Sequence, residues 1–304
     1  MTVLYNAKQS MNKVEAIRDA LIEAVLAGAA EVLAVKQAGD VGVRFKDAKE
    51  LVTVADERSD AAILAVFRNK LTAIDPEISF QLEESGISGA NANKRAGADP
   101  IDGTTHFASG GHWYAVQAHY VENGVPLVGV IFQPEYYLPL EMTPRCRGRI
   151  AWAVKGSGAF VRNSELMFGS FVLAESRVLR KRPGPVTGAL LSCVPVGTKM
   201  TDEERARAIR VCESGVASVS TGTGCAGGNV MLVIFGGQHV YANFGAGEDL
   251  DLIPPQVIAE EAGLTVWGVD RQSPRWHVRK QPFVIAPNEE IAGKFLDAAG
   301  FTAH

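Results

Sequence analysis

The amino-acid sequence predicts a two-part fold: helices on an antiparallel sheet in the first half, and alternating strands and helices in the second. Two observations carry this prediction. In residues 114–134, apolar and polar residues alternate on both sides of Asn123-Gly124, a strong indication of a β-hairpin. Beyond residue 147, segments suited to strands and to helices follow one another. We therefore expect an α+β domain, residues 1–147, and an α/β domain, residues 148–304.

The elements before the hairpin are two helices and a strand. In residues 12–37 the apolar side chains recur at steps of three, four and seven, as one buried helix face requires. Residues 51–54 predict a short strand, and residues 56–70 a second helix with its apolar residues on one side. In the second half, the expected strands and helices are residues 189–193, 202–214, 229–235, 240–244 and 253–261.

Composition excludes several classes of function. The formal net charge of -4 and the pI near 5.9 give no general attraction to nucleic acid or to anionic lipid, so any phosphate chemistry needs local groups or bound cations. The four cysteines form no C-x-x-C pair, which favours a reducing compartment, and we expect the cytoplasm. The first residues are polar, and no apolar stretch approaches the ~20 residues that span a bilayer, so we expect neither export nor membrane insertion.

The most informative segment is D-P-I-D-G-T-T-H-F at residues 99–107. Pro100 fixes the backbone between two aspartates, and Gly103 permits a turn with no side chain near an incoming oxyanion. If Thr104 opens a helix, the free amides of its first turn form a phosphate seat. Carboxylates beside such a seat would repel phosphate, unless a hard cation such as Mg²⁺ lies between them. Taken alone, a D-x-x-D pair also fits a turn or a helix cap.

The complete string resembles the signature of the inositol monophosphatase family. Further family landmarks follow in the expected order: V-T-x-x-D at residues 52–56, E-E-S at residues 83–85, and E-E-A-G at residues 260–263. The resemblance extends from about residue 46 to about residue 287.

This resemblance implies a five-layer αβαβα sandwich of the inositol monophosphatase and fructose-1,6-bisphosphatase type, with the active site between the domains, and a homodimer. It implies Mg²⁺-dependent, Li⁺-sensitive hydrolysis of a small phosphate monoester such as inositol-1-phosphate. Related phosphatases act on fructose 1,6-bisphosphate, histidinol phosphate or 3′-phosphoadenosine 5′-phosphate, and they remain alternatives because only the pocket separates them. A non-catalytic relative that binds RNA or polymerase is opposed by the acidic balance and by the intact carboxylates.

Carried over residue by residue, the family's metal ligands are Glu83, Asp99, Asp102, Asp251 and the carbonyl of Ile101. Such hard oxygen donors suit two or three Mg²⁺ ions, or Mn²⁺ as a substitute, and argue against zinc. Glu84 remains an alternative to Glu83, and Asp249 to Asp251. The segment after Asp251 departs from the family pattern, because Leu250 replaces a tryptophan and two prolines, Pro254 and Pro255, replace small residues. We expect these prolines in the first turn of a helix that begins near Asp251.

The resemblance assigns catalysis to Asp56 and Thr104 as a water-activating pair, together with Glu83. A hydroxyl linked to a carboxylate can take a proton from a metal-held water as that water attacks phosphorus. Asp56 also fits the N-cap of the helix that follows it. For substrate contacts the resemblance implies eight residues: Asp102, Gly103, Thr104, Thr105, Gly224, Cys225, Ala226 and Asn243. Of these, Cys225 stands at a family hydroxyl residue and Asn243 at a family glutamate that contacts the substrate's hydroxyls.

Overall fold

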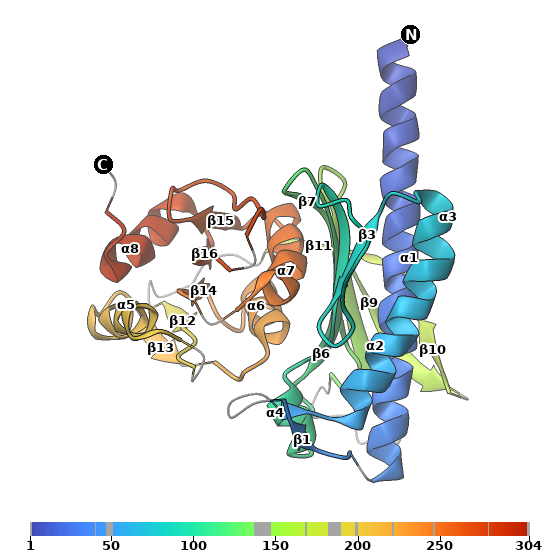
Figure 1. Cartoon of the computed structure of the whole chain (residues 1–304). Helices are drawn as coiled ribbons and strands as arrows, with labels where there is room; N and C mark the ends of the chain where they lie inside the picture. The colour runs from blue at the N-terminus through green and yellow to red at the C-terminus, as the bar shows by residue number, and fades with distance from the viewer. Residues whose placement is uncertain are drawn as a thin grey trace.

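The structure, a computed structural model, describes residues 2–39, 41–46, 51–136, 147–167, 169–181, 190–197, 200–220, 222–245, 247–278 and 280–302. Two large β-sheets alternate with layers of helices, residues 44–45 and residues 51–52 form a separate two-stranded sheet, and the chain builds one side of the molecule before it crosses to the other (Figure 1).

Helices cover the outer face of the larger sheet. The elements before that sheet are α1 (Thr2–Ala38), β1 (Arg44–Phe45), β2 (Leu51–Val52), α2 (Val54–Val66), the π-helical turn η1 (Phe67–Leu71) and α3 (Thr72–Ile74). Ile17, Leu21 and Val25 are fully buried at intervals of four residues, which confirms the predicted apolar face of the first helix. The second predicted helix also forms, but it begins at Val54 because Thr53 caps it.

The larger sheet has nine strands in the order β10-β9-β8-β7-β6-β5-β3-β4, with β11 also paired to β9. Its strands are β3 (Ser79–Leu82), β4 (Gly86–Ser88), β5 (Lys94–Asp102), β6 (Ala115–Glu122), β7 (Val125–Gln133), β8 (Arg147–Val154), β9 (Gly158–Met167), β10 (Ser170–Leu173) and β11 (Arg177–Leu179). β3 and β5 run parallel, whereas the other neighbours are antiparallel. Asn123 and Gly124 have φ angles of 52° and 73°, so the predicted hairpin between β6 and β7 is confirmed.

The larger sheet does not end at the predicted domain boundary near residue 147. Strands β8 to β11 extend it to Leu179, and the next strand along the chain, β12 (Leu191–Cys193), belongs to the other sheet. The chain therefore changes sheets between these two strands, beyond the expected boundary, and the division at 147 stays a prediction.

The smaller sheet has five strands in the order β13-β12-β14-β16-β15. After β12 the chain forms α5 (Asp202–Glu213), β13 (Ser218–Ser220), α6 (Ala226–Phe235), β14 (Val240–Asn243), α7 (Asp249–Glu261), β15 (Thr265–Gly268), β16 (Phe283–Ala286) and α8 (Glu289–Ala299). In Figure 1, α6 and α7 lie between the two sheets, and α5 and α8 cover the far face of the smaller one. The predicted five-layer αβαβα sandwich is confirmed.

α7 approaches the larger sheet closely at a glycine. A Cβ atom added to Gly129 of β7 would lie 2.4 Å from the carbonyl oxygen of Pro254 in α7, so only glycine fits there. Pro254 and Pro255 lie in the second turn of α7, not in the first turn as the sequence predicts, because the helix begins at Asp249. The missing proline amides leave the carbonyls of Leu250 and Asp251 without their usual partners within the helix.

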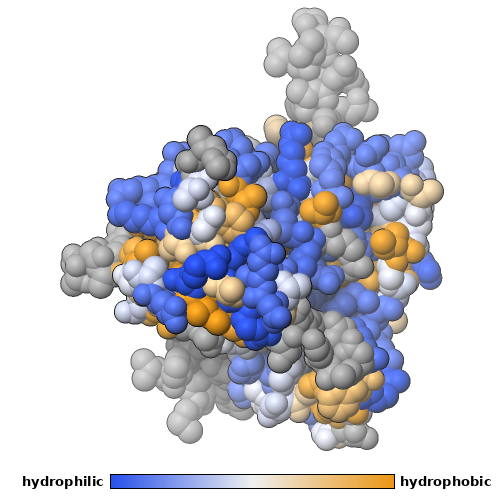
Figure 2. Space-filling view, turned by 60° about the vertical axis from the view of Figure 1, so that its left-hand side comes forward, coloured by the Kyte–Doolittle hydropathy of each residue, from blue (hydrophilic) through white to orange (hydrophobic). Residues whose placement is uncertain are grey.

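Figure 2 shows a face of mostly hydrophilic residues, interrupted by separate hydrophobic patches, and exposed apolar residues in such an arrangement are ordinary. Among the described residues, no helix is both long enough and apolar enough to cross a membrane.

Candidate metal centre and active site

Asp99 and Asp102 reach one point because β5 carries a bulge between them. Asp99 lies opposite Gln117 of β6, whereas Asp102 lies opposite Ala115, so β5 has one extra residue in this interval. In a regular strand, residues three apart point to opposite faces of the sheet. The extra residue, in a segment that contains Pro100, turns both carboxylates toward the same side.

α7 contributes the third carboxylate. One oxygen each from Asp99, Asp102 and Asp251 lies within 4.8 Å of the others. Asp251 is the third residue of α7 and accepts a hydrogen bond from the amide of Glu248, the N-cap. The sequence alternative, Asp249, is fully buried and pairs with Arg95 instead. We call Asp99, Asp102 and Asp251 the carboxylate cluster.

The electrostatics of the carboxylate cluster suit a cation. Burial raises the pKa of Asp99 well above its ordinary value, and the neighbouring Glu83, Asp251 and Asp102 raise it further. Burial, followed by the charge of Asp251, raises the pKa of Asp102 to about 7. Without a cation these acids repel one another and favour protonation. The donors are all carboxylate oxygens, which fits Mg²⁺ or Mn²⁺.

The start of α6 holds Asp102 in place. The amides of Ala226 and Gly227 donate to the two oxygens of Asp102 at 2.9 and 2.7 Å, and the Cys225 thiol donates at 3.3 Å. The positive end of α6 therefore faces a carboxylate of the cluster. Of the predicted substrate residues 224–226, Cys225 is fully buried against Asp102, and Gly224 precedes it with a φ of 78°.

Thr104 and Asp56 lie together as the resemblance implies. The Thr104 hydroxyl is 3.1 Å from Asp56 Oδ1 and 3.0 Å from the carbonyl oxygen of Ile101, the predicted fifth metal ligand. The other oxygen of Asp56 accepts from the amide and hydroxyl of Thr53, at 2.7 and 2.6 Å. Thr53, not Asp56, is the N-cap of α2, and Asp56 completes the capping box. One carboxylate thus orients a hydroxyl and caps a helix, while burial raises its pKa.

The turn after Asp102 has the predicted form. Gly103 has a φ of 101° and precedes the short helix α4 (Thr104–Ala108). A Cβ at Gly103 would lie 3.1 Å from both Cys225 Cβ and the carbonyl oxygen of Trp113, so both the backbone angle and the space require glycine. Thr104 and Thr105 form the first turn of α4, where amides have no partner within the helix.

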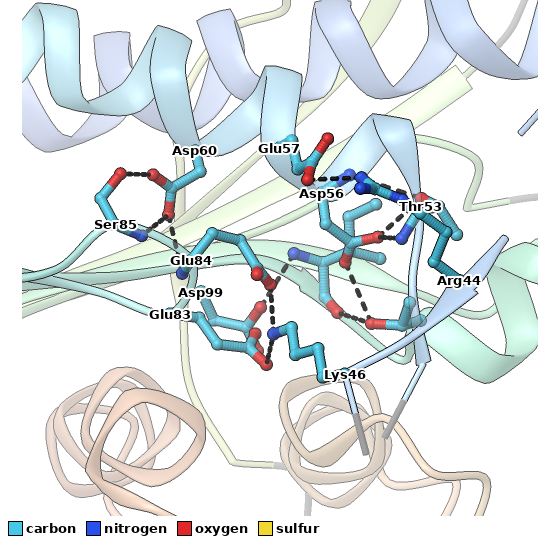
Figure 3. Close-up of polar contacts among 12 residues, drawn as sticks. Arg44, Lys46, Thr53, Asp56, Glu57, Asp60, Glu83, Glu84, Ser85 and Asp99 are labelled. Atoms are coloured by element: carbon cyan, nitrogen blue, oxygen red, sulfur yellow. Dashed lines mark hydrogen bonds and ion pairs between the residues drawn. The ribbon is translucent and has the colours of Figure 1, made fainter. Parts of the chain in front are cut away.

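Glu83 and Glu84 share one lysine at the exposed side of the cluster. Figure 3 shows Lys46 between them, with its Nζ 3.2 Å from Glu83 Oε1 and 2.5 Å from Glu84 Oε1. The side chains are 35% and 15% exposed, respectively. Glu83 increases the pKa of Asp99, which places its charge near the cluster, whereas Glu84 has its own pKa raised to about 7, mainly by burial.

Asp60 fixes the turn that carries both glutamates. Its Oδ1 accepts from the amides of Glu84 and Ser85 at 3.1 and 3.4 Å, and its Oδ2 accepts from the Ser85 hydroxyl (Figure 3). Asp60 is buried and lies one helical turn after Asp56 on α2. The i, i+4 spacing of Asp56 and Asp60 is the signal by which Asp60 could have been predicted. Lys46 lies outside every motif and has no such signal in the sequence.

Asn243 is enclosed in the described structure. It ends β14 and is 1% exposed, its Nδ2 lies 3.1 Å from the Tyr241 hydroxyl, and its Oδ1 accepts from the amide of Gly245 at 2.9 Å. Both ends of its amide group therefore have protein partners. A role in holding substrate hydroxyls stays a prediction.

Known proteins with similar sequences cluster in one family. An inositol-1-monophosphatase of Synechocystis sp. is 35% identical over 117 residues, which are 37% of this chain and 38% of that protein. Inositol monophosphatase 2 of Saccharomyces cerevisiae is 31% identical over 120 residues, 38% of this chain and 36% of that protein. A histidinol-phosphatase of Mycobacterium tuberculosis is 30% identical over 142 residues, 47% and 50% of the two chains. The matches thus span half or less of these relatives.

Solved structures resemble the whole fold. An inositol monophosphatase from Anabaena (Nostoc) sp. superposes with a TM-score of 0.70 at 20% identity, over 95% of this chain and 97% of that one. The extragenic suppressor protein suhB of Bartonella henselae does so with a TM-score of 0.70 at 22% identity, over 93% and 98%. At these identities the likeness concerns the fold. The family match itself covers residues 13–301, and the chain therefore belongs to the inositol monophosphatase family.

Proposed function

We propose that this protein is a Mg²⁺-dependent phosphatase that hydrolyses a small phosphate monoester. The observation that carries the proposal is the carboxylate cluster, Asp99, Asp102 and Asp251, within 4.8 Å. A hydroxyl-carboxylate pair lies beside it, because Thr104, two residues after Asp102, contacts Asp56 of α2. Together they supply a cation site and a proton acceptor for an attacking water, which metal-assisted hydrolysis needs.

Each residue has a definite task in this reaction. Asp99, Asp102 and Asp251 would hold the ions, with Glu83 at the exposed side. Bound Mg²⁺ would supply Lewis-acid polarisation of the phosphate and lower the pKa of a bound water. Thr104 would take the water's proton toward Asp56, whose other oxygen stays fixed by Thr53. The first-turn amides of residues 103–105 would face the phosphate oxygens.

The site specifies the alcohol part of the substrate less closely than the phosphate group. Where the family has a carboxylate, Asn243 has a neutral amide group whose two ends already have protein partners. A charged hydrogen bond to the alcohol is therefore absent, a difference from a neutral one of roughly 1 kcal/mol or about fivefold in affinity. We therefore propose a broad monoesterase that accepts inositol-1-phosphate and simpler esters such as glycerol 2-phosphate. Histidinol phosphate is the first alternative, because one relative is named histidinol-phosphatase.

A substrate panel tests this function. Turnover of p-nitrophenyl phosphate, inositol-1-phosphate, glycerol 2-phosphate and histidinol phosphate is measured with Mg²⁺, with Mn²⁺ and with EDTA. We expect metal-dependent release of phosphate from several esters. Hydrolysis that persists in EDTA would reject the metal mechanism, and a preference above ~100-fold for one ester would reject broad specificity.

Three finer properties accompany the proposal: inhibition by Li⁺, a homodimer and a cytoplasmic location. Titration of LiCl against turnover, with NaCl as the ionic-strength control, tests the first. We expect weaker inhibition than in relatives without prolines after the metal-binding aspartate, because Pro254 and Pro255 change the helix that carries Asp251. Light scattering tests the dimer. The RNA- or polymerase-binding alternative would be favoured if no ester were hydrolysed.

A further inference from the structure

A charged residue is buried at the start of α7, two positions before Asp251. Asp249 is fully buried, and its Oδ2 lies 3.2 Å from Nη2 of Arg95. The side-chain amide of Gln81 lies 3.0 and 3.1 Å from the two oxygens of Asp249. We call these three residues, Gln81, Arg95 and Asp249, the α7 clamp.

The α7 clamp joins the same three elements that carry the metal-site carboxylates. Gln81 lies on β3, two residues before Glu83. Arg95 lies on β5, the strand of Asp99, and Asp249 lies on α7, two residues before Asp251. β3 and β5 are adjacent parallel strands, with Gln81 opposite Gly97. Each residue of the clamp therefore lies either two positions before a predicted ligand or on the same strand as one.

This arrangement fixes the N-terminal end of α7, whereas at the other end Glu261 accepts hydrogen bonds from the amides of Gly156 and Gly158 at 2.8 and 2.7 Å. A buried aspartate is tolerated only when its charge is compensated, so Asp249 holds α7 at the one place where Arg95 and Gln81 converge. The adjacent buried residue His119 does not supply a second positive charge to Asp249. Burial, and then the charge of Arg95, lower the pKa of His119 well below its ordinary value, so its ring is neutral.

The β-sheet leaves room for the helix beside the clamp. A Cβ at Gly97 would lie 2.4 Å from His119 Cε1 and 2.9 Å from Leu250 Cδ2. Together with Gly129, this glycine allows α7 to lie directly on the sheet. Glycines thus set how closely α7 approaches the sheet, and the ion pair and hydrogen bonds of the clamp set the position of its first turn.

We propose that Gln81 and Arg95 are positioning residues: through Asp249 they fix the first turn of α7 and so hold Asp251 at the distance from Asp99 that a divalent cation requires. The inference deepens the proposed function, because it concerns the same metal site. It assigns no contact with substrate to either residue. Residues that orient metal ligands affect metal affinity by about 10–100-fold when they are changed.

Calorimetric titration of Mn²⁺ into the full-length protein tests the proposal without turnover. The variants are Gln81→Met, which leaves the ion pair, and Arg95→Met, with Arg95→Lys as the conservative variant. We expect Gln81→Met and Arg95→Met to weaken Mn²⁺ binding by about tenfold or more, and Arg95→Lys to recover part of that loss. Half-saturating Mg²⁺ for ester hydrolysis should rise in parallel, while KM for the ester at saturating Mg²⁺ stays unchanged.

Asp75→Asn is the matched control. Asp75 is a buried carboxylate that pairs with Lys13 and Lys94, at 2.5 and 3.1 Å. Lys94 begins β5, five residues before Asp99, which is about 17 Å along a strand. Asp75→Asn should lower the melting temperature and leave Mn²⁺ affinity at the wild-type value.

The outcomes separate the clamp from the proposed activity. Wild-type Mn²⁺ affinity in Gln81→Met, accompanied only by a loss of thermal stability, would overturn the proposed role of the clamp. Gln81→Met keeps the Arg95–Asp249 pair, so it still provides the test if Arg95→Met does not fold. If the wild type binds Mn²⁺ and the clamp variants bind it weakly, but no ester is hydrolysed, the clamp stands and the phosphatase proposal fails. A wild type that binds no divalent cation would overturn both.

Discussion

Two sides of the same metal site are built in different ways. On the buried side, Asp102 receives hydrogen bonds from the amides of Ala226 and Gly227 and from the Cys225 thiol. On the exposed side, Glu83 and Glu84 depend on Lys46, the last described residue before residues 47–50 (Figure 3). We call these two groups the buried corner and the exposed corner.

The difference concerns what holds each carboxylate before a cation arrives. The buried corner uses backbone amides at a helix start, which cannot move without moving α6, so Asp102 is preorganised. In the exposed corner, the long side chain of Lys46 supplies the positive charge beside Glu83 and Glu84, and we expect an incoming cation to displace it. Although burial alone would lower the pKa of Lys46, Glu83 and Glu84 raise it, so Lys46 remains charged. We therefore expect the buried corner to supply rigidity and the exposed corner to exchange cations.

The largest effect is expected where the corners meet. Asp99 is influenced by Glu83 from one side and by Asp251 and Asp102 from the other. Asp99→Asn should reduce kcat by on the order of 10³-fold or more, because the variant loses a charged ligand at the centre of the site. The metal-free variant should be as stable as the wild type or more stable, since repulsion is relieved. Near-wild-type kcat at saturating Mg²⁺ would contradict this.

The second prediction concerns stability without metal. The folded-state pKa values of Asp102 and Glu84 are raised to about 7, above their unfolded values near 4. The folded state therefore binds more protons between about pH 4 and pH 7, and stability is lost as pH rises through 7. In EDTA the melting temperature should be higher at pH 5 than at pH 8, by on the order of 5 °C.

Mg²⁺ should remove most of that pH dependence, because the cation compensates the ionised carboxylates. The measurement is a series of thermal scans at fixed ionic strength, with Asp102→Asn as the variant whose dependence on pH should be flatter. A melting temperature in EDTA that rises from pH 5 to pH 8 would show that the cluster does not control stability in this range.

A smaller effect is expected at the exposed corner. Lys46→Ala removes a positive charge that competes with the cation, so half-saturating Mg²⁺ should fall, by up to about fivefold for a contribution near 1 kcal/mol. Lys70→Ala, which breaks a surface pair with Glu23, is the control for a general loss of positive charge. An increase in half-saturating Mg²⁺ would mean that Lys46 helps to hold the ion instead of replacing it.

The smallest effect is expected from an isosteric change at the buried corner. In the protein, the Cys225 thiol donates to Asp102 and its sulfur accepts a hydrogen bond from the Gly228 amide, both at 3.3 Å. Cys225→Ser keeps both the donor and the acceptor. We expect kcat/KM within about threefold of wild type, whereas Cys225→Ala should lose more, because a buried acceptor then lacks one of its donors. Equal kcat/KM values for the serine and alanine variants would show that the thiol contributes only volume.

The sequence predicted the site best where the residues of the site are close together along the chain. The signature at residues 99–107 holds two of the three clustered aspartates, the glycine of the turn and Thr104 in one segment, and the V-T-x-x-D motif contains Asp56, which contacts the Thr104 hydroxyl. These relations depend on short-range geometry, a bulge, a turn and a capping box, which a few neighbouring residues specify. The helix register of Asp251 was less certain, because Asp249 fits the same pattern.

What the sequence determined by itself is the chemistry, hard oxygen donors and a glycine turn, and the periodicities of a β-hairpin followed by alternating strands and helices. Only the tertiary structure decided which side chains the carboxylates meet. Asp249 rather than Asp251 is paired with Arg95, Asp102 receives the amides of α6, and Lys46 joins Glu83 and Glu84. The first two contacts depend on the packing of α7 and α6 on the larger sheet, and the third joins the residue after β1 to the residues after β3. Contacts between distant segments leave no periodic trace along the chain.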